Sequence, residues 1–306
     1  MMYIKENLLD LIGDTPMVYL RRFGKGLHAT IAAKLEMFNP YSVKDRPALC
    51  MIEAAEREGK IDSGTTVIEA TSGNTGLAVA FICAAKGYRC VISMSEDQSD
   101  ERKRLLRALG AELVLTPAVE GSRGAKLKAL DLWEQNPNSY YIDQHCNPNN
   151  PCAHRETTGM ELWRDTDGKI DVFVAGLGTC GTIVGVSETL KERKASVKIV
   201  GVEPEAAPML SAGKYQPHRQ AGVSPGFIPE VFKEEFVDEI VTASEEASFE
   251  TCRELARTEG IVAGISSGMT AYAARQLAKR PANSGKLIVC MLVDTGERYL
   301  SVRGLY

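Results

Sequence analysis

The sequence predicts an α/β protein with a doubly wound sheet, divided over two lobes. Three observations predict this fold: short β-branched runs alternate with longer helical periods, several strand candidates are apolar at consecutive positions, and 306 residues exceed the usual size of one core. Consecutive apolar positions are typical of parallel strands that helices cover on both faces. Parallel strands of this kind are joined by right-handed crossovers.

The strand candidates are short apolar runs such as KLIVCMLV near the C-terminus. They cover 29–36, 65–70, 89–94, 111–116, 170–176, 197–203 and 286–293. The helix candidates lie between them and have apolar residues at helical spacing. They cover 45–58, 75–86, 99–109, 122–135, 152–164, 182–193, 246–259 and 267–279. A glycine that could form a left-handed C-terminal cap follows four of these helices, namely Gly59, Gly87, Gly110 and Gly260.

Two turn-rich segments interrupt this alternation. The segment 136–151, NPNSYYIDQHCNPNNP, is the predicted boundary between the lobes. The Gly- and Pro-rich stretch 204–230 is predicted to be a long irregular excursion, and loops of that length usually have a function.

Composition argues against several classes of protein. A net charge of −4, with 44% hydrophobic and 25% charged residues, is ordinary for a soluble globular chain and gives no sign of a nucleic-acid or membrane partner. No apolar run approaches the roughly 20 residues that cross a bilayer, and the N-terminus lacks the apolar block of a signal peptide, so a cytoplasmic protein is expected. The densest basic cluster is predicted to be a solvated helix face; it comprises Arg102, Lys103, Arg104 and Arg107.

The eight cysteines are predicted to be reduced thiols. They form no CxxC pair, and some lie inside apolar runs, as Cys83 and Cys290 do. This pattern favours buried thiols over disulfides or metal ligands, and no metal site is expected.

The first motif with chemical potential is NPYSVKDRPA (39–48), a turn followed by the start of a helix. Lys44 lies at this junction and could expose its amine to a pocket. From local sequence alone, an ordinary surface lysine is the better interpretation.

The second motif is EATSGNTGLAVA (69–80), in which a strand ends in a turn of small residues and a helix begins. Its hydroxyls, amide and backbone N–H groups suit an anion such as a carboxylate. Simple capping of the helix by Asn74 or Thr75 is the alternative.

The third motif is VAGLGTCGTIVGV (174–186), again a strand, a glycine turn and a helix. Gly176, Gly178 and Gly181 satisfy the dinucleotide pattern GxGxxG, and Glu203 ends the next strand. A nicotinamide-dependent oxidoreductase is therefore one interpretation. The same turn could hold a single phosphate ester at the helix N-terminus.

Five ordered motifs together resemble the cysteine synthase and cystathionine β-synthase family. They are SVKDR (42–46), TSGNTG (71–76), GTCGT (178–182), SSG (266–268) and DTGERYLS (294–301). The resemblance runs from IGDTPMVYL at 12–20 to the end of the chain. It raises Lys44 from a surface lysine to the predicted catalytic residue.

The resemblance implies fold type II of the pyridoxal-phosphate enzymes, with the cofactor between two lobes. Residues 47–150 would form a smaller, mobile lobe that binds the substrate carboxylate. Residues 1–46 and 151–306 would form a larger lobe that binds the phosphate of pyridoxal 5′-phosphate.

The resemblance also implies roles for individual residues. Lys44 matches the lysine that holds the cofactor and then removes the substrate α-proton, and Asn74 matches the asparagine that contacts the cofactor's phenolic oxygen. Thr295 falls where the family places a serine facing the pyridine nitrogen. The substrate-carboxylate grip is matched by Thr71, Ser72, Thr75 and Gln144, and the phosphate loop by Gly178, Thr179, Cys180, Gly181 and Thr182.

The expected reaction is β-replacement on an activated serine, giving L-cysteine from O-acetyl-L-serine and sulfide with release of acetate. Related activities of the family stay open: O-phosphoserine sulfhydrylase, cystathionine β-synthase, cyanoalanine or diaminopropionate synthase, and cysteine desulfhydration. A homodimer is expected, and the C-terminal tail of serine acetyltransferase is a possible partner of the active site.

Four departures from the family pattern leave the leaving group and the nucleophile open. NPYSVK is one residue shorter than the usual NPxxSVK, and Cys180 stands where many members have glycine. His145 replaces an aromatic residue after the glutamine, as either a polar pocket residue or a packed histidine. AGVSPGFIP (221–229) places Ser224 and Pro225 where small residues face the substrate.

Overall fold

The computed structural model describes residues 4–306. Contacts divide this part of the chain into two units: unit 1 comprises 4–12 and 44–150, and unit 2 comprises 13–43 and 151–306. The predicted division assigns 4–12 and 44–46 to the larger lobe, whereas they belong to unit 1. The mobility of the smaller lobe stays a prediction.

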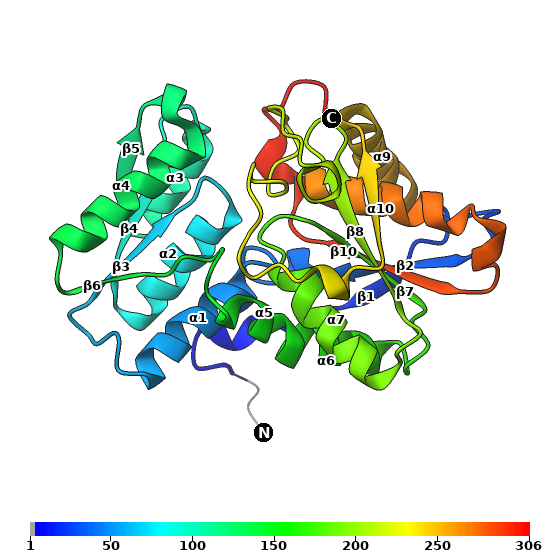
Figure 1. Cartoon of the computed structure of the whole chain (residues 1–306), viewed down its shortest axis with the longest axis horizontal. Coiled ribbons are helices and arrows are strands. Elements are labelled where there is room, and N and C mark those ends of the chain that lie inside the picture. Colours follow the sequence, from blue (N-terminus) through cyan, green and yellow to red (C-terminus); the bar gives the residue numbers. More distant parts are fainter. Residues whose placement is uncertain (1–3) are drawn as a thin grey trace. The chain divides into compact units, whose positions relative to one another are not determined.

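Unit 1 contains a four-stranded parallel sheet in the order β5-β4-β3-β6 (Figure 1). Ile68 and Val91 on one face of the sheet pack on Ala129 of helix α4, and Cys90 on the other face contacts Cys83 of helix α2. The elements are α1 (Asp45–Arg57), β3 (Thr66–Ala70), α2 (Asn74–Lys86), β4 (Arg89–Ser95), α3 (Asp100–Ala108), β5 (Glu112–Thr116), α4 (Gly121–Gln135) and β6 (Ser139–Tyr141), with short 3-10 turns at Leu8–Leu11 and Ala118–Glu120.

Unit 2 contains a six-stranded sheet in the order β1-β2-β10-β7-β8-β9, parallel except for β1. The strands are β1 (Met17–Tyr19), β2 (Thr30–Leu35), β7 (Val172–Gly176), β8 (Lys198–Pro204), β9 (Glu239–Ala243) and β10 (Leu287–Leu292). The helices are α5 (Asn149–Ala153), α6 (Gly159–Asp165), α7 (Gly181–Arg193), α8 (Met209–Ala212), α9 (Glu245–Glu259) and α10 (Ile265–Ala278).

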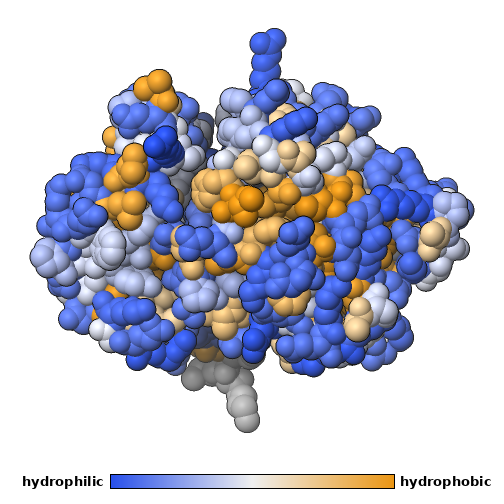
Figure 2. Space-filling model, viewed as in Figure 1, coloured by the Kyte–Doolittle hydropathy of each residue, from blue (hydrophilic) through white to orange (hydrophobic). Residues whose placement is uncertain are grey.

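The sheet of unit 2 is covered on both faces, as the consecutive apolar positions predict. Val172 and Val174 of β7 belong to the core beneath α10, whereas the alternating positions Phe173 and Ala175 belong to the core beneath α7. Neighbouring positions of one strand therefore serve two separate cores. Figure 2 shows mostly polar residues on the viewed face, with apolar surface concentrated over unit 2.

Every predicted strand is present within two residues of its expected ends, and so is every predicted helix except one. The prediction does not include β1, β6 and β9. Strands β1 and β6 have three residues each, too few to show a period, and β9 is an edge strand with only one buried residue. The four glycines predicted to cap helices all have φ between 66° and 83°, in the left-handed region.

The exception is the helix predicted over 152–164. It is divided into α5, a π-helical turn at His154–Thr158, and α6. A side chain at Gly185 of α7 would lie only 2.1 Å from Pro151 O and 2.9 Å from the His154 Cβ, so the two elements pack backbone to backbone. Single π-turns of this kind are often found at functional sites.

All eight cysteines are free thiols. Among residues 4–306 there is no group of three His, Cys, Asp or Glu side chains arranged to hold a metal ion. No helix in this range has both the length and the apolar character to span a membrane.

Candidate active site

The predicted site residues fall into two sets, one in each unit. Unit 1 holds Lys44, Thr71, Ser72, Asn74, Thr75 and Gln144, and unit 2 holds Gly178, Thr179, Cys180, Gly181, Thr182 and Thr295.

Lys44 is the N-cap residue of α1, and the segment before it is anchored by residues near the C-terminus. The Val43 N–H donates to Val293 O at 3.0 Å. The Arg298 guanidinium donates to Tyr41 O and lies over the Tyr41 ring. The motifs SVKDR and DTGERYLS, far apart in the sequence, are therefore connected through the backbone that leads into Lys44.

The turn Thr71–Gly73 presents the beginning of helix α2. Gly73 is the N-cap residue and no side chain caps the helix, so the alternative of capping by Asn74 or Thr75 is wrong. Thr71 Oγ1 instead accepts from the Gly73 N–H at 3.1 Å and fixes the turn. The first N–H groups of a helix have no intrahelical acceptor and carry the positive end of its dipole. This geometry suits an anion.

Arg102 supports this turn from helix α3, where its guanidinium donates to Ser72 O at 2.8 Å. Lys103 Nζ donates to Glu96 O, so only Arg104 and Arg107 of the basic cluster form the exposed face that was predicted. Sequence reasoning missed Arg102, since nothing in its neighbourhood distinguishes it from a solvated arginine.

Gln144 joins the turn through Thr75. The Thr75 Oγ1 donates to Gln144 Oε1 at 2.7 Å, and both side chains are buried. Asn150 Nδ2 donates to Gln144 O at 2.7 Å, and Asp143 has φ 47°, so the backbone here is held in an unusual conformation. Unit 1 thus brings together the second motif and the glutamine that the resemblance assigns to it.

His145 is neutral at physiological pH. Burial lowers its pKa to about 4, and the positive charges of Lys126 and Lys44 add to this effect while Asp143 opposes it. An imidazole so far from its usual pKa does not act as a cation here. The effect of Lys44 on this pKa shows that the lysine charge lies near the His145 ring.

The phosphate-loop motif turns sharply before helix α7. Cys180, its N-cap residue, has φ 66° and makes no side-chain cap, whereas Thr179 Oγ1 accepts from the Gly181 N–H at 3.4 Å. The left-handed conformation explains why glycine is common here in the family that the sequence resembles. A side chain at Gly178 would lie 2.3 Å from Gly222 O, so the loop also requires glycine at that position. Cys180 is 3% exposed, which leaves little access for a redox role.

Thr182, which is half-buried, pairs with the buried His154. Thr182 Oγ1 lies 3.2 Å from His154 Nε2, and His154 Nδ1 lies 2.9 Å from Thr158 Oγ1. The π-turn places His154 on this side of α7. Sequence reasoning missed His154, because the interruption of a helix by a π-turn leaves no clear signal in the pattern.

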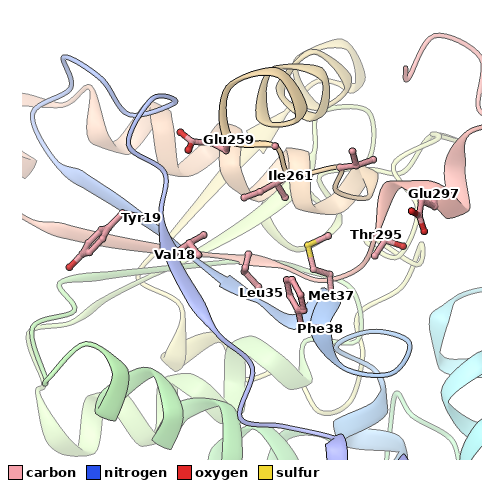
Figure 3. A pocket seen from close by; sticks show the side chains of 11 residues that line it. Val18, Tyr19, Leu35, Met37, Phe38, Glu259, Ile261, Thr295 and Glu297 are labelled. Atoms are coloured by element: carbon pink, nitrogen blue, oxygen red, sulfur yellow. The ribbon is translucent and has the colours of Figure 1, made fainter.

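Thr295 lies in unit 2, before the 3-10 turn Gly296–Tyr299, and its backbone pairs with Ala263. It lines a cavity of about 400 Å³ with Met37, Phe38, Ile261 and Val262, and residues 178–182 are not among the lining residues. In the view of Figure 3, Thr295 and Glu297 lie at one end of this cavity and Tyr19 at the other.

Asp294, the neighbour of Thr295, points into the interior. Its Oδ2 accepts from Tyr299 Oη at 2.6 Å, and a side chain at Gly264 would collide with its Oδ1. The carboxylate therefore packs against α10 and Tyr299, inside unit 2.

Ser266 carries a second hydroxyl that could contact a cofactor. Sequence reasoning includes it only as part of the SSG motif. It lies in the first turn of α10 and is 7% exposed. One turn later, Met269 and Thr270 contact Gly176, directly before the phosphate-loop motif. Ser266 thus lies on the helix that packs beside that loop.

Two residues have structural partners that limit their predicted roles. Glu203 is buried and accepts from the N–H groups of Leu210 and Ser211, so it caps α8 and is not available to a nucleotide ribose. The Ser224 Oγ donates to Ala207 O at 2.7 Å, and its backbone has φ 45°. The Ser224 hydroxyl is thus engaged within the 204–230 excursion.

Comparisons with known proteins agree with the resemblance. The family described as "Pyridoxal-phosphate dependent enzyme" matches residues 8–294. A cysteine synthase of Staphylococcus aureus is 49% identical over 299 residues, covering 97% of this chain and 96% of the relative. The crystal structure of a cysteine synthase from Entamoeba histolytica has a TM-score of 0.96 at 40% identity, covering 98% of this chain and 90% of that one. An O-ureido-L-serine synthase has a TM-score of 0.95 at 43% identity, covering 98% and 95%.

Proposed function

Since the chain belongs to the family of pyridoxal-phosphate-dependent enzymes, we propose that it is a cysteine synthase that makes L-cysteine from O-acetyl-L-serine and sulfide and releases acetate. One observation carries this proposal: the Thr75–Gln144 hydrogen bond joins the second motif to its predicted glutamine beside the uncapped start of α2. A helix start of this kind, lined by hydroxyls and an amide, suits the carboxylate of an amino acid.

We propose that one group of residues, called here the carboxylate cradle, holds the substrate carboxylate. The cradle consists of the backbone N–H groups at the start of α2 and of Thr71, Ser72, Thr75 and Gln144. Arg102 fixes the Ser72 carbonyl, and Asn150 fixes the Gln144 carbonyl. These two hydrogen bonds hold the donors of the cradle in place before a ligand binds. Donors held in this way favour the binding of a carboxylate.

Unit 2 offers residues that fit the phosphate of the cofactor. Helix α7 is 13 residues long, its N-cap residue Cys180 does not cap it, and the Thr179 hydroxyl accepts from the Gly181 N–H at 3.4 Å. Thr182 adds a second hydroxyl, whose orientation His154 fixes. Backbone N–H groups, adjacent hydroxyls and the helix dipole together form a phosphate site. In this assignment GTCGT holds one phosphate ester, and Glu203 is left to its role in capping α8.

When bound, pyridoxal phosphate withdraws electrons from the substrate and so acidifies its α-proton. Lys44 is the residue that would hold the cofactor, and we assign the acceptance of this proton to its Nζ. The hydrogen bonds from Val43 and Arg298 hold the backbone that leads to Lys44. Asn74, at the start of α2, is assigned to the cofactor's phenolic oxygen.

Two hydroxyls compete for the pyridine nitrogen. Thr295 is assigned by the resemblance, whereas the packing of α10 beside Gly176 favours Ser266. Thr295→Val and Ser266→Ala separate them, because only removal of the contacting hydroxyl should change the cofactor's absorption spectrum. An unchanged spectrum in both variants would mean that neither hydroxyl contacts the pyridine nitrogen.

The proposal is tested by supplying O-acetylserine, O-phosphoserine and serine separately, each with sulfide, and measuring L-cysteine. Rapid turnover of O-acetylserine is expected. Preference for another activated serine, or for a nucleophile such as homocysteine or cyanide, would reassign the enzyme to a related β-replacement. Release of sulfide from cysteine as the main reaction would indicate desulfhydration. A protein that binds no pyridoxal phosphate after reconstitution would overturn the proposal altogether.

We further propose a cytoplasmic homodimer whose carboxylate cradle can also bind the C-terminal tail of serine acetyltransferase. A peptide ends in a carboxylate, as an amino acid does, so the cradle could accept either ligand. Sedimentation tests the dimer. Competition between O-acetylserine and the tail peptide tests the partner, and the absence of any competition would remove it.

A further inference from the structure

Glu69 is a buried carboxyl at the end of strand β3, two residues before Thr71. It is 1% exposed, and its Oε1 accepts from the N–H of its neighbour Ala70 at 3.0 Å. Its Oε2 has no hydrogen-bond partner within residues 4–306. A buried carboxylate with so few donors is costly, so the neutral acid is favoured.

Glu69 lies where the two strands that carry the cradle end side by side. Strands β3 and β6 are parallel, with Ile68 opposite Tyr141, and the Ile142 N–H continues the pairing to Ile68 O at 3.1 Å. Strand β3 leads into the Thr71–Thr75 turn, and β6 leads to Gln144. The Gln144 backbone amide is close enough to Glu69 to stabilise its charged form.

We propose that Glu69 is a positioning residue behind the carboxylate cradle, and that its ionisation weakens carboxylate binding there. This inference rests on the proposed function, because it requires that the cradle binds a carboxylate. Glu69 itself does not touch the substrate.

The surrounding groups put this ionisation near physiological pH. Burial raises the Glu69 pKa to about 8, Asp143 adds to the increase, and Lys126 of α4 opposes it. The other titratable groups that interact with Glu69 have raised pKa values and stay neutral near pH 8; they are Cys90 of β4 and Tyr140 and Tyr141 of β6. Above about pH 8, Glu69 therefore adds a negative charge behind an anion site without compensation from these neighbours.

The test measures inhibition of the holoenzyme by propionate, in competition with the amino-acid substrate, between about pH 6.5 and 9.5. Propionate has no group that titrates in this range, so a change of Ki reports on the protein. In the wild type, Ki should rise about fivefold across pH 8, as expected for one added like charge at short range. In Glu69→Gln, which keeps the size and stays neutral, Ki should rise much less over the same pH range.

Glu112→Gln is the matched control, since Glu112 is an exposed carboxylate of the same sheet. Its Ki should follow the wild-type pH profile. Dividing the Ki profile of a variant by that of the wild type cancels the contributions of all groups that titrate in both proteins. An equal rise of Ki in Glu69→Gln and wild type would overturn the inference. If Glu69→Gln does not fold, the wild type alone decides, because a Ki independent of pH contradicts the inference equally.

The two proposals fail in different ways. A wild type that turns over no activated serine at pH 7 overturns the proposed function and this inference with it. A wild type that turns over O-acetylserine, but whose pH profile does not depend on Glu69, leaves the proposed function intact and overturns the inference alone.

Discussion

The Arg298 guanidinium donates a hydrogen bond to Tyr41 O, three residues before Lys44. This bond connects the C-terminal motif to the backbone that leads into the proposed catalytic lysine. Arg298→Ala should therefore reduce kcat by about tenfold or more, through misplacement of Lys44. Arg89→Ala, at an exposed arginine, is the control and should retain activity. Activity within twofold of the wild type in a folded Arg298→Ala would contradict this relationship.

Lys44→Ala should lose both turnover and the visible absorbance band that depends on the lysine–cofactor link. Loss of a catalytic base typically costs about 10²–10⁴-fold in rate. Lys60→Ala is a suitable comparison, because Lys60 lies in the same unit with its side chain 57% exposed. Steady-state kinetics and an absorption spectrum of each reconstituted protein check the prediction, and a yellow, active Lys44→Ala would refute it.

Thr75 and Gln144 should act as a unit in substrate binding. Thr75→Val and Gln144→Leu are each expected to raise KM for O-acetylserine by about tenfold, because each leaves the other polar group unpaired. In a double-mutant cycle their coupling should lie in the range of about 0.5–3 kcal/mol. Thr75→Ser keeps the hydroxyl and should stay near wild type. Strict additivity of the two single effects would mean that the hydrogen bond has no part in binding.

Cys180 should tolerate glycine and reject a β-branched residue. Its left-handed conformation strains a side chain by about 1–3 kcal/mol, whereas glycine has a larger unfolded-state entropy that offsets part of this relief. The free energy of unfolding of Cys180→Gly should thus lie within about 1 kcal/mol of the wild-type value. Cys180→Val should be clearly less stable, unlike Cys290→Val in strand β10. Urea denaturation measures all three, and equal stability of both valine variants would contradict the assignment of strain.

The raised pKa of Glu69 predicts a specific pH dependence of stability. The folded state keeps the Glu69 proton up to about pH 8, whereas the unfolded chain releases it near its ordinary pKa of 4.5. The corresponding stability is fully present below about pH 4.5 and is lost as the pH rises to 8, with a total on the order of 5 kcal/mol. Glu69→Gln should not show this loss. The Tm of the variant relative to the wild type should therefore increase as the pH rises from 5 to 8. Parallel Tm curves for the two proteins would show that Glu69 does not titrate as expected.

Local pattern was sufficient for most of the fold. The strands and helices of both units follow from hydrophobic periodicity and glycine caps, because both reflect short-range conformational preference and burial. It was insufficient for β1 and β6, which are too short to show a period, and for β9, a partly exposed edge strand. The π-turn at His154–Thr158 also escaped prediction, since it depends on the close packing of Gly185 against Pro151.

The family and the motif around Lys44 were determined by the sequence alone, through the order of five motifs along the chain. Only the tertiary structure decided that Arg298 holds Tyr41, that Arg102 supports Ser72, that Glu203 caps α8, and that Glu69 is buried beneath the cradle. The physical reason is that these interactions join residues that the chain keeps apart or that look alike in sequence. A solvated arginine and a positioning arginine differ only in what lies within hydrogen-bonding distance, and folding alone sets that distance.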